Sequence, residues 1–264
     1  MSLAFRVKKI IALLYDVLGI SQRKIKGISK KYHNQYIRVV NYHHVLHREM
    51  FIRQLEFYKE HFENINFDDF EAFLNGGKML KEKPGIMITF DDGFDDNYDI
   101  AIECLEKNGF TGWFMVSSDL VDRNGYMTYS QISEMVSKGH VIGCHTATHH
   151  RMEVNDTDQM LEYEIRLSKE TLEEKIGSEI CIFCWCGGEE EHYTTKAARK
   201  IKDSNYKYSF MTNSYPVLRD VDPFHIQRIN IEDGWPISLV KLQICGFMDK
   251  RFGNKRKRVN QKTA

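Results

Sequence analysis

The sequence predicts an α/β fold in which about seven parallel strands, wrapped by helices, form a deformed (β/α)7-type barrel. From residue 36 onward, short β-rich runs alternate with helical patterns, which is typical of a parallel sheet covered by helices. The run GIMITF at 85–90 is apolar without alternation, so it indicates a strand buried on both faces. A length of 264 residues with 42% hydrophobic residues fits one domain of this class.

The individual elements follow from local patterns along the chain. Thr128 and Gln131 form a capping-box pattern that opens a helix, and the Asn-Gly pair ending at Gly109 closes another. A longer helix is expected at about 156–176, and a closing helix at about 237–244. Strands are expected at 37–42, 85–90, 110–116, 141–144, 180–184, 206–211 and 224–231.

Both ends of the chain differ from the middle in their charge. Residues 1–35 are predicted to be a basic, amphipathic helical segment that either docks on the domain's own core or contacts an anionic membrane surface. Its apolar residues Phe5, Ile10, Leu13, Leu14 and Leu18 share a helical face. Residues 249–264 are predicted to be a basic, solvated tail. The catalytic domain is therefore expected at 36–248.

Composition excludes several classes of protein. Lys plus Arg and Asp plus Glu number 37 each, so the chain lacks the global basic field that nucleic-acid binding requires. Six cysteines in a chain of this length are expected to be reduced. The C-x2-C-x-C run at 181–186 is interpreted as small residues that fill a buried strand, with a metal cluster as the alternative. No secretory signal pattern is recognised, which favours a cytoplasmic protein.

Chemistry is expected where polar residues follow apolar runs, because reactive groups in parallel α/β folds lie at the carboxyl ends of strands. Asp91 and Asp92 follow one such run directly. Two adjacent carboxylates there repel each other, and their ionisation is costly unless a nearby cation compensates the charge. His145 and His149 follow another run, four residues apart, a spacing that allows both imidazoles to reach one metal ion. Together these four residues predict a metal site with a spare carboxylate.

The two motifs, TFDDG at 89–93 and H-T-A-T-H at 145–149, resemble those of the polysaccharide deacetylases of the NodB-homology group, carbohydrate esterase family 4. The resemblance extends over about residues 36 to 248. It implies a NodB-like barrel in which Asp91 is the catalytic base and Asp92, His145 and His149 bind a divalent metal, most often Zn²⁺. It also implies that Thr146 orients the loop between the two histidines and that Arg228 hydrogen-bonds the catalytic carboxylate.

Two segments depart from the pattern of this family. At 183–188 the sequence FCWCGG stands where relatives have an F-x-Y-P-x-G segment, so Cys186 replaces a proline. Trp185 is either the wall for stacking a sugar or a core residue. The late L-x-H motif, whose histidine is the general acid in many members, has no counterpart. His43 is the first candidate for that role, with His44 and His225 as alternatives.

The leading hypothesis is a metal-dependent hydrolase that removes an N-acetyl group from an amino sugar of a polysaccharide or glycolipid precursor. It is expected to be cytoplasmic and peripheral to the inner face of the membrane. Two alternatives stay open: hydrolysis of a non-sugar amide, and a catalytically silent glycan-binding protein on the same fold. The oligomeric state is not predicted.

Overall fold

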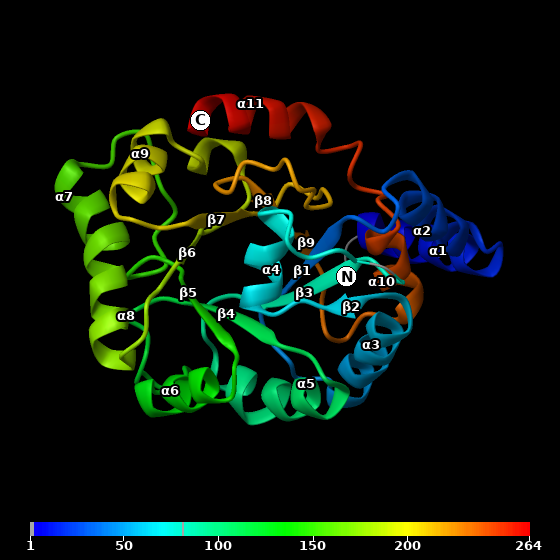
Figure 1. The fold of residues 1–264 in the computed structure, drawn as a ribbon, viewed down its shortest axis with the longest axis horizontal. Coiled ribbons are helices and arrows are strands. Elements are labelled where there is room, and N and C mark those ends of the chain that lie inside the picture. The colour runs from blue at the N-terminus through cyan, green and yellow to red at the C-terminus, as the bar shows by residue number, and fades with distance from the viewer. Residues whose placement is uncertain (1–2, 81) are drawn as a thin grey trace.

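The computed structural model describes residues 3–80 and 82–264, and its centre is one sheet of parallel strands curved into a nearly closed barrel (Figure 1). The strands follow the order β8-β7-β6-β5-β4-β3-β1-β9, and β2 pairs with β3 off this path. Their bounds are β1 Ile37–Tyr42, β2 Glu63–Asn64, β3 Gly85–Phe90, β4 Gly112–Val116, β5 Val141–Cys144, β6 Ile182–Cys184, β7 Tyr208–Met211, β8 Ile226–Gln227 and β9 Ile229–Asn230.

The central strands form because their side chains are buried on both faces. All six positions of β1 and all six of β3 are buried, and the two strands pair in register from Ile37 with Gly85 to Tyr42 with Phe90. A short β-branched or aromatic run that is buried throughout is stable only inside a covered parallel sheet. The predicted barrel class is confirmed.

The barrel closes through one short stretch of chain that serves two neighbours. Gln227 pairs with Met211 of β7, whereas Ile229 pairs with Val40 of β1. Arg228 lies between these two pairs, and its backbone N–H donates to the Met211 carbonyl at 2.8 Å. The sequence predicts one strand at 224–231, but the structure has two short ones, because the chain changes partner at Arg228.

Helices cover the outside of the barrel, as Figure 1 shows for α3, α5, α6, α8 and α9. Single π-helical turns at Asn97–Ala101 and Glu162–Leu167 interrupt two of the helical regions, so the long helix expected at 156–176 is three consecutive pieces. The α-helices are α1 Leu3–Val17, α2 Ile20–Lys31, α3 Arg48–His61, α4 Phe67–Leu74, α5 Ile102–Asn108, α6 Tyr129–Ser137, α7 Asp158–Leu161, α8 Ser168–Ile176, α9 Thr195–Asp203, α10 Ile237–Ile244 and α11 Gly253–Thr263.

The ends of the chain are helical and packed. The predicted N-terminal segment forms α1 and α2, joined at Gly19 in a left-handed conformation, while its residues 1–2 lie outside the described residues. The prediction of a solvated tail at 249–264 is wrong, because Val259 and Thr263 are buried and α11 packs beside α9. Within residues 3–80 and 82–264, none of the helices combines the length and apolarity needed to cross a bilayer.

Candidate active site

The carboxyl ends of β3 and β5 bring two sequence-distant motifs together. Asp91 and Asp92 follow β3, and His145 follows β5, with β4 between these two strands. Two backbone hydrogen bonds hold the loops in place: Asp91 N–H donates to the Tyr42 carbonyl at 2.9 Å, and His145 N–H donates to the Val116 carbonyl at 2.8 Å. Parallel register thus places both motifs at the same edge of the barrel.

Asp92, His145 and His149 converge on one point. Oδ1 of Asp92 lies 3.4 Å from Nε2 of His145 and 3.0 Å from Nε2 of His149. This oxygen is buried and makes no hydrogen bond of acceptable geometry to any described residue. A buried, unpaired carboxylate oxygen beside two imidazole nitrogens is the arrangement that a divalent cation would satisfy.

The rest of the His145 ring also fits a metal ligand. Its Nδ1 lies 2.9 Å from the backbone carbonyl of Cys184, so this nitrogen carries the proton and Nε2 keeps its lone pair. A backbone acceptor of this kind fixes both the tautomer and the orientation of the ring. The donor set of one carboxylate and two imidazoles therefore fits a divalent metal such as zinc.

The two loops that carry these ligands contain residues in an unusual backbone conformation. Asp92, Thr146 and His149 have positive φ angles of 74°, 64° and 63°. At Thr146, which is fully buried, Oγ1 accepts a hydrogen bond from the His150 N–H at 3.0 Å, which ties the turn between the two histidines together. Left-handed, non-glycine residues are costly and cluster at functional sites, which supports a functional role for this edge of the barrel.

Asp91 does not face the same partners as Asp92. Its two carboxylate oxygens accept hydrogen bonds from Nη1 and Nη2 of Arg228 at 2.6 and 2.8 Å, and both residues are buried. Arg228 is only 1% exposed, so it contacts the carboxylate and not an open substrate surface. A bidentate, buried guanidinium fixes the orientation of Asp91 and keeps it ionised.

The charges of the site shift its pKa values strongly. Burial raises the pKa of Asp91, but the charges of Arg228 and His145 lower it more, so the pKa lies below its ordinary value. Burial also opposes ionisation of Asp92, and the two neighbouring imidazoles overcome it, so its pKa lies well below the usual range. Clustered perturbed groups of this kind are typical of reactive sites.

The pKa of His145 is shifted in the opposite direction. Burial lowers its pKa, whereas the sulfur groups of Cys186 and Cys184 and the Asp91 carboxylate raise it more, so the net pKa lies well above the ordinary value. In the metal-free chain this imidazole therefore holds a proton more tightly than a free histidine does. A metal ion must displace that proton, so metal binding is expected to weaken as the pH falls.

Cys186 lies at the site, although the sequence analysis interpreted it as a substitute for proline within a run of small, strand-filling residues. One ligand-capable atom each of His145, His149 and Cys186 lie within 4.8 Å of one another. The Cys186 thiol is buried and lies 3.5 Å from the His145 carbonyl. The signal in the sequence was the C-x2-C-x-C run, whose members Cys181 and Cys184 lie in or beside β6. The Cys184 sulfur also lies within 4.8 Å of ligand-capable atoms of Asp91 and His145, so strand packing alone fits only Cys181.

Trp185 is placed differently from the prediction. Its side chain is 2% exposed, its indole N–H donates to Ser209 Oγ at 2.7 Å, and its ring packs against Phe183 and Tyr193. A side chain enclosed in this way cannot offer a face to a sugar. The assignment of Trp185 as a sugar-stacking wall is therefore corrected to a core residue.

The three candidate general acids have different surroundings. His43 directly follows Tyr42 of β1, whose carbonyl accepts the Asp91 N–H at 2.9 Å, and its charge is the smallest of those that lower the pKa of Asp91. Nδ1 of His44 lies 2.6 Å from Oδ2 of Asp96, and its ring stacks on Phe94. His225 is buried, with Nε2 2.8 Å from Thr263 Oγ1 of α11. Of these three, His43 has the closest relation to Asp91.

Comparison with known proteins gives a consistent result. Residues 78–208 match the model of the family described as "Polysaccharide deacetylase". A curated relative from Bacillus subtilis (strain 168), named "Putative polysaccharide deacetylase YxkH", is 28% identical over 150 residues, which are 56% of this chain and 52% of that protein. The chain thus aligns with about half the length of this relative.

Solved structures share the fold. The Streptococcus pyogenes deacetylase PplD, in complex with acetate, has a TM-score of 0.71 at 19% identity and covers 79% of this chain and 98% of its own. IcaB from Ammonifex degensii has a TM-score of 0.67 at 22% identity, with coverage of 81% and 97%. BC0361, a polysaccharide deacetylase from Bacillus cereus, has a TM-score of 0.67 at 22% identity, with coverage of 79% and 69%.

The TFDDG and H-T-A-T-H motifs meet at one edge of a nearly closed parallel barrel. The region matched by the family model contains both motifs. These sequence and structural findings agree: residues 78–208 match the polysaccharide deacetylase family, and the barrel shares the fold of solved deacetylases.

Proposed function

We propose that this protein is a metal-dependent hydrolase that removes an N-acetyl group from an amino sugar of a polysaccharide or glycolipid precursor. The observation that carries the proposal is the convergence of Asp92, His145 and His149 beside the buried, ionised carboxylate of Asp91. The match to the polysaccharide deacetylase family supports an acetylated glycan as the substrate.

In the proposed reaction Asp91 is the base. Its carboxylate takes a proton from the water that attacks the acetyl carbonyl, and Arg228 holds the carboxylate in one orientation throughout. Asp92, His145 and His149 would hold a divalent metal, and this donor set suits Zn²⁺. When bound, the metal would polarise the acetyl carbonyl and the water. Because its pKa is lowered, Asp91 is ionised at neutral pH, which is the form that a base requires.

His43 is the proposed general acid. It would donate a proton to the amine that leaves the sugar, and its position near Asp91 supports this role. Thr146 is proposed to keep the two histidines in place through its hydrogen bond from His150 N–H.

The proposed place of action is the cytoplasm, at the inner face of the membrane, where glycan precursors are built. Recovery of the native protein from a periplasmic or secreted fraction would contradict this proposal.

The test measures metal content and acetate release from N-acetylglucosamine oligomers and lipid-linked acetamido sugars. Asp91→Asn is expected to keep its metal and to lose a factor of about 10² to 10⁴ in kcat, because a positioned general base contributes that much. His145→Ala is expected to lose the metal together with the activity. His43→Gln is expected to retain metal and to lose the alkaline limb of the pH–rate profile.

Two results would contradict the proposal. Cleavage of a non-sugar amide with no acetate release from any sugar would select the amide hydrolase. Glycan binding that Asp91→Asn leaves unchanged, with no turnover by the parent protein, would select the silent binder.

A further inference from the structure

Helix α1 packs on the barrel with one face and exposes a second apolar face. The inner face carries Ala12, which is buried, and Phe5 and Tyr15, whose rings contact Trp235 and Phe247. Lys8 and Asp16, also on this side, contact the Trp235 ring and Lys241. This inner face anchors the helix and fixes which residues point outward.

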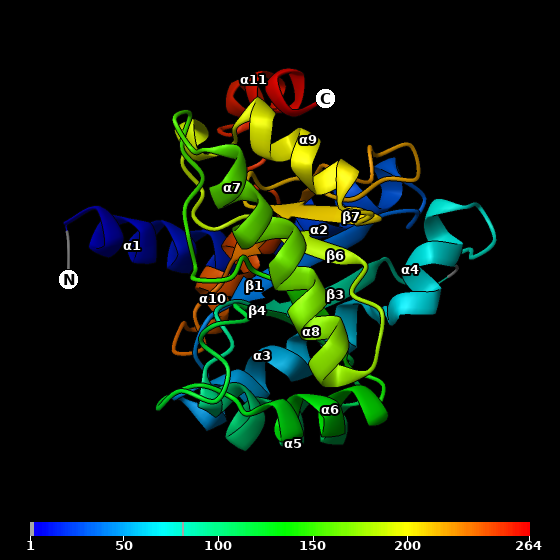
Figure 2. The same cartoon turned by 90° about the vertical axis from the view of Figure 1, so that its left-hand side faces the viewer.

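The outward face is a row of large apolar side chains at helical spacing, called here the α1 row: Leu3, Val7, Ile10, Leu14 and Val17. Leu3 is 78% exposed, Ile10 60% and Val17 77%. Leu13 and Leu18 beside the row are also exposed. Figures 1 and 2 show α1 projecting from the body of the barrel. A contiguous exposed apolar row of this kind marks an interaction surface.

Charge is divided sharply between the ends of the chain and the barrel. Residues 1–35 contain eight Lys or Arg and one acidic residue, Asp16, and residues 249–264 contain seven Lys or Arg and one acidic residue, Asp249. The intervening segment 36–248 contains 22 Lys or Arg against 35 Asp or Glu. The overall balance of zero therefore hides a strongly basic region and an acidic barrel.

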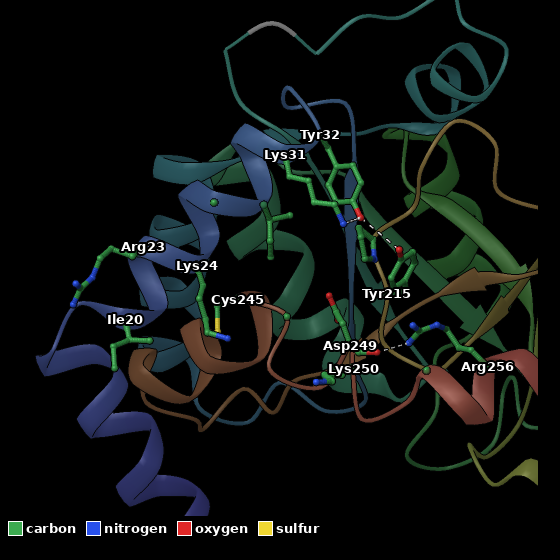
Figure 3. A pocket seen from close by; sticks show the side chains of 15 residues that line it. Ile20, Arg23, Lys24, Lys31, Tyr32, Tyr215, Cys245, Asp249, Lys250 and Arg256 are labelled. Carbon is green, nitrogen blue, oxygen red and sulfur yellow. Dashed lines mark hydrogen bonds between the residues drawn. The ribbon is translucent and has the colours of Figure 1, made fainter.

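The fold joins the two basic ends around a pocket of about 1070 Å³ between α2, the Tyr215–Pro216 segment, the end of α10 and the start of α11 (Figure 3). Five cationic side chains line it: Arg23, Lys24, Lys31, Lys250 and Arg256. Within the described residues, no carboxylate lies within ion-pair distance of these five groups.

The carboxylate in the lining, Asp249, is already neutralised. Arg38 donates to its two oxygens at 3.1 and 2.7 Å, and Ser214 donates to one of them at 2.8 Å. Apolar and aromatic groups complete the walls, among them Ile20, Ile28 and the rings of Tyr32 and Tyr215. The pocket thus offers several cations and an apolar wall, which suits an anionic group attached to a hydrophobic molecule.

We propose that the α1 row and this basic pocket together dock the protein on an anionic phospholipid membrane. The α1 row lies in the boundary between head groups and acyl chains, and the pocket receives a phosphodiester head group. A second copy of the chain is a poorer occupant, because pairing two α1 rows would bring two strongly basic segments together. Docking does not rest on the proposed deacetylase reaction, since no residue of that site takes part.

The experiment is co-sedimentation of the full chain with vesicles of phosphatidylcholine alone and of phosphatidylcholine mixed with phosphatidylglycerol. Binding to the mixed vesicles, weakened by salt, is expected, with little binding to the neutral ones. The double variant Ile10→Asp/Leu14→Asp is expected to abolish binding. Lys24→Glu/Lys250→Glu is expected to weaken it roughly tenfold or more, because each basic residue near the surface adds to the attraction.

Matched controls separate docking from general effects. Leu46→Asp/Val154→Asp replaces two equally exposed apolar residues of the barrel, and Lys59→Glu/Lys175→Glu makes the same change in net charge there. Both controls are expected to bind as the parent does. All these positions are exposed, so circular dichroism is expected to show folded variants.

Three outcomes would overturn the proposal. The first is no binding to mixed vesicles, and the second is equal loss in the controls. The third is a dimer in light scattering without lipid that Ile10→Asp/Leu14→Asp converts to a monomer, since this would assign the α1 row to a second copy. Vesicle binding by Asp91→Asn is measured in parallel, and unchanged binding would show that docking is independent of catalysis.

Discussion

At the scale of single residues, the site depends on side chains whose partners are distant in sequence. Asp91 and Arg228 are 137 residues apart and form a buried bidentate pair, while the neighbouring Asp92 faces two histidines. Adjacent carboxylates therefore have separate partners, because successive residues of an extended chain point in different directions. Asp92 also adopts a positive φ of 74°.

Cys186 gives a prediction at this scale. A thiolate is a soft ligand that strengthens zinc and cobalt binding, and Cys186 lies with His145 and His149 in a group of ligand-capable atoms. In the Co²⁺-loaded protein we expect a near-ultraviolet sulfur-to-cobalt absorption band that Cys186→Ser removes. Cys181→Ser, which alters a cysteine away from the histidines, should keep the band. An unchanged spectrum in Cys186→Ser would exclude the thiol as a ligand.

At the scale of elements, the same residue, Arg228, takes part both in closing the barrel and in forming the site. Arg228 connects β8 and β9, and its side chain reaches the carboxylate that follows β3. The same residue also donates to Cys184 Sγ at 2.9 Å, at the end of β6. A single buried guanidinium therefore links three parts of the barrel edge.

Replacing Arg228 tests this link. Arg228→Met is expected to lower the free energy of unfolding by about 3–5 kcal/mol, because it leaves the buried Asp91 charge without its partner. The double variant Arg228→Met/Asp91→Asn should recover part of that loss, since no uncompensated charge remains. Urea unfolding of the parent, both single variants and the double variant measures the coupling. If the losses of unfolding free energy in the two single variants simply add in the double variant, a direct interaction between Arg228 and Asp91 is contradicted.

At the scale of the whole molecule, the free energy of unfolding is expected to decrease as the pH falls. Hydrogen bonds from Lys107 and Arg48 lower the pKa of Glu103 to about 2, and those from Arg166 and Lys200 lower that of Glu162 to about 2. Because these pKa values are lower in the folded state, the stability they contribute is present above the ordinary carboxyl pKa of about 4.3 and is lost as the pH falls towards 2.

The measurement is urea unfolding between pH 5 and 3 for the parent and Glu103→Gln/Glu162→Gln. The variant is expected to lose less stability over this range in low salt. Both carboxylates are partly exposed to solvent, so the difference should be small and should vanish in high salt. A difference that salt does not change would contradict this explanation.

The sequence by itself determined the barrel class, the strands at 37–42, 85–90 and 141–144, and the candidate ligands Asp92, His145 and His149. These features can be predicted from the sequence because apolar runs and the residues directly after them are local properties of the chain. The strand ends then meet through parallel pairing, which needs no knowledge of distant side chains.

Only the tertiary structure decided the burial of Trp185, the position of Cys186 and the split of 224–231 into two strands. It also decided that α1 docks through Phe5 and Ala12 and leaves a second apolar row in solvent. Which face of an amphipathic segment is covered, and which side chains become neighbours, depends on contacts between residues far apart in sequence. The periodicity of one segment contains no information about its partner.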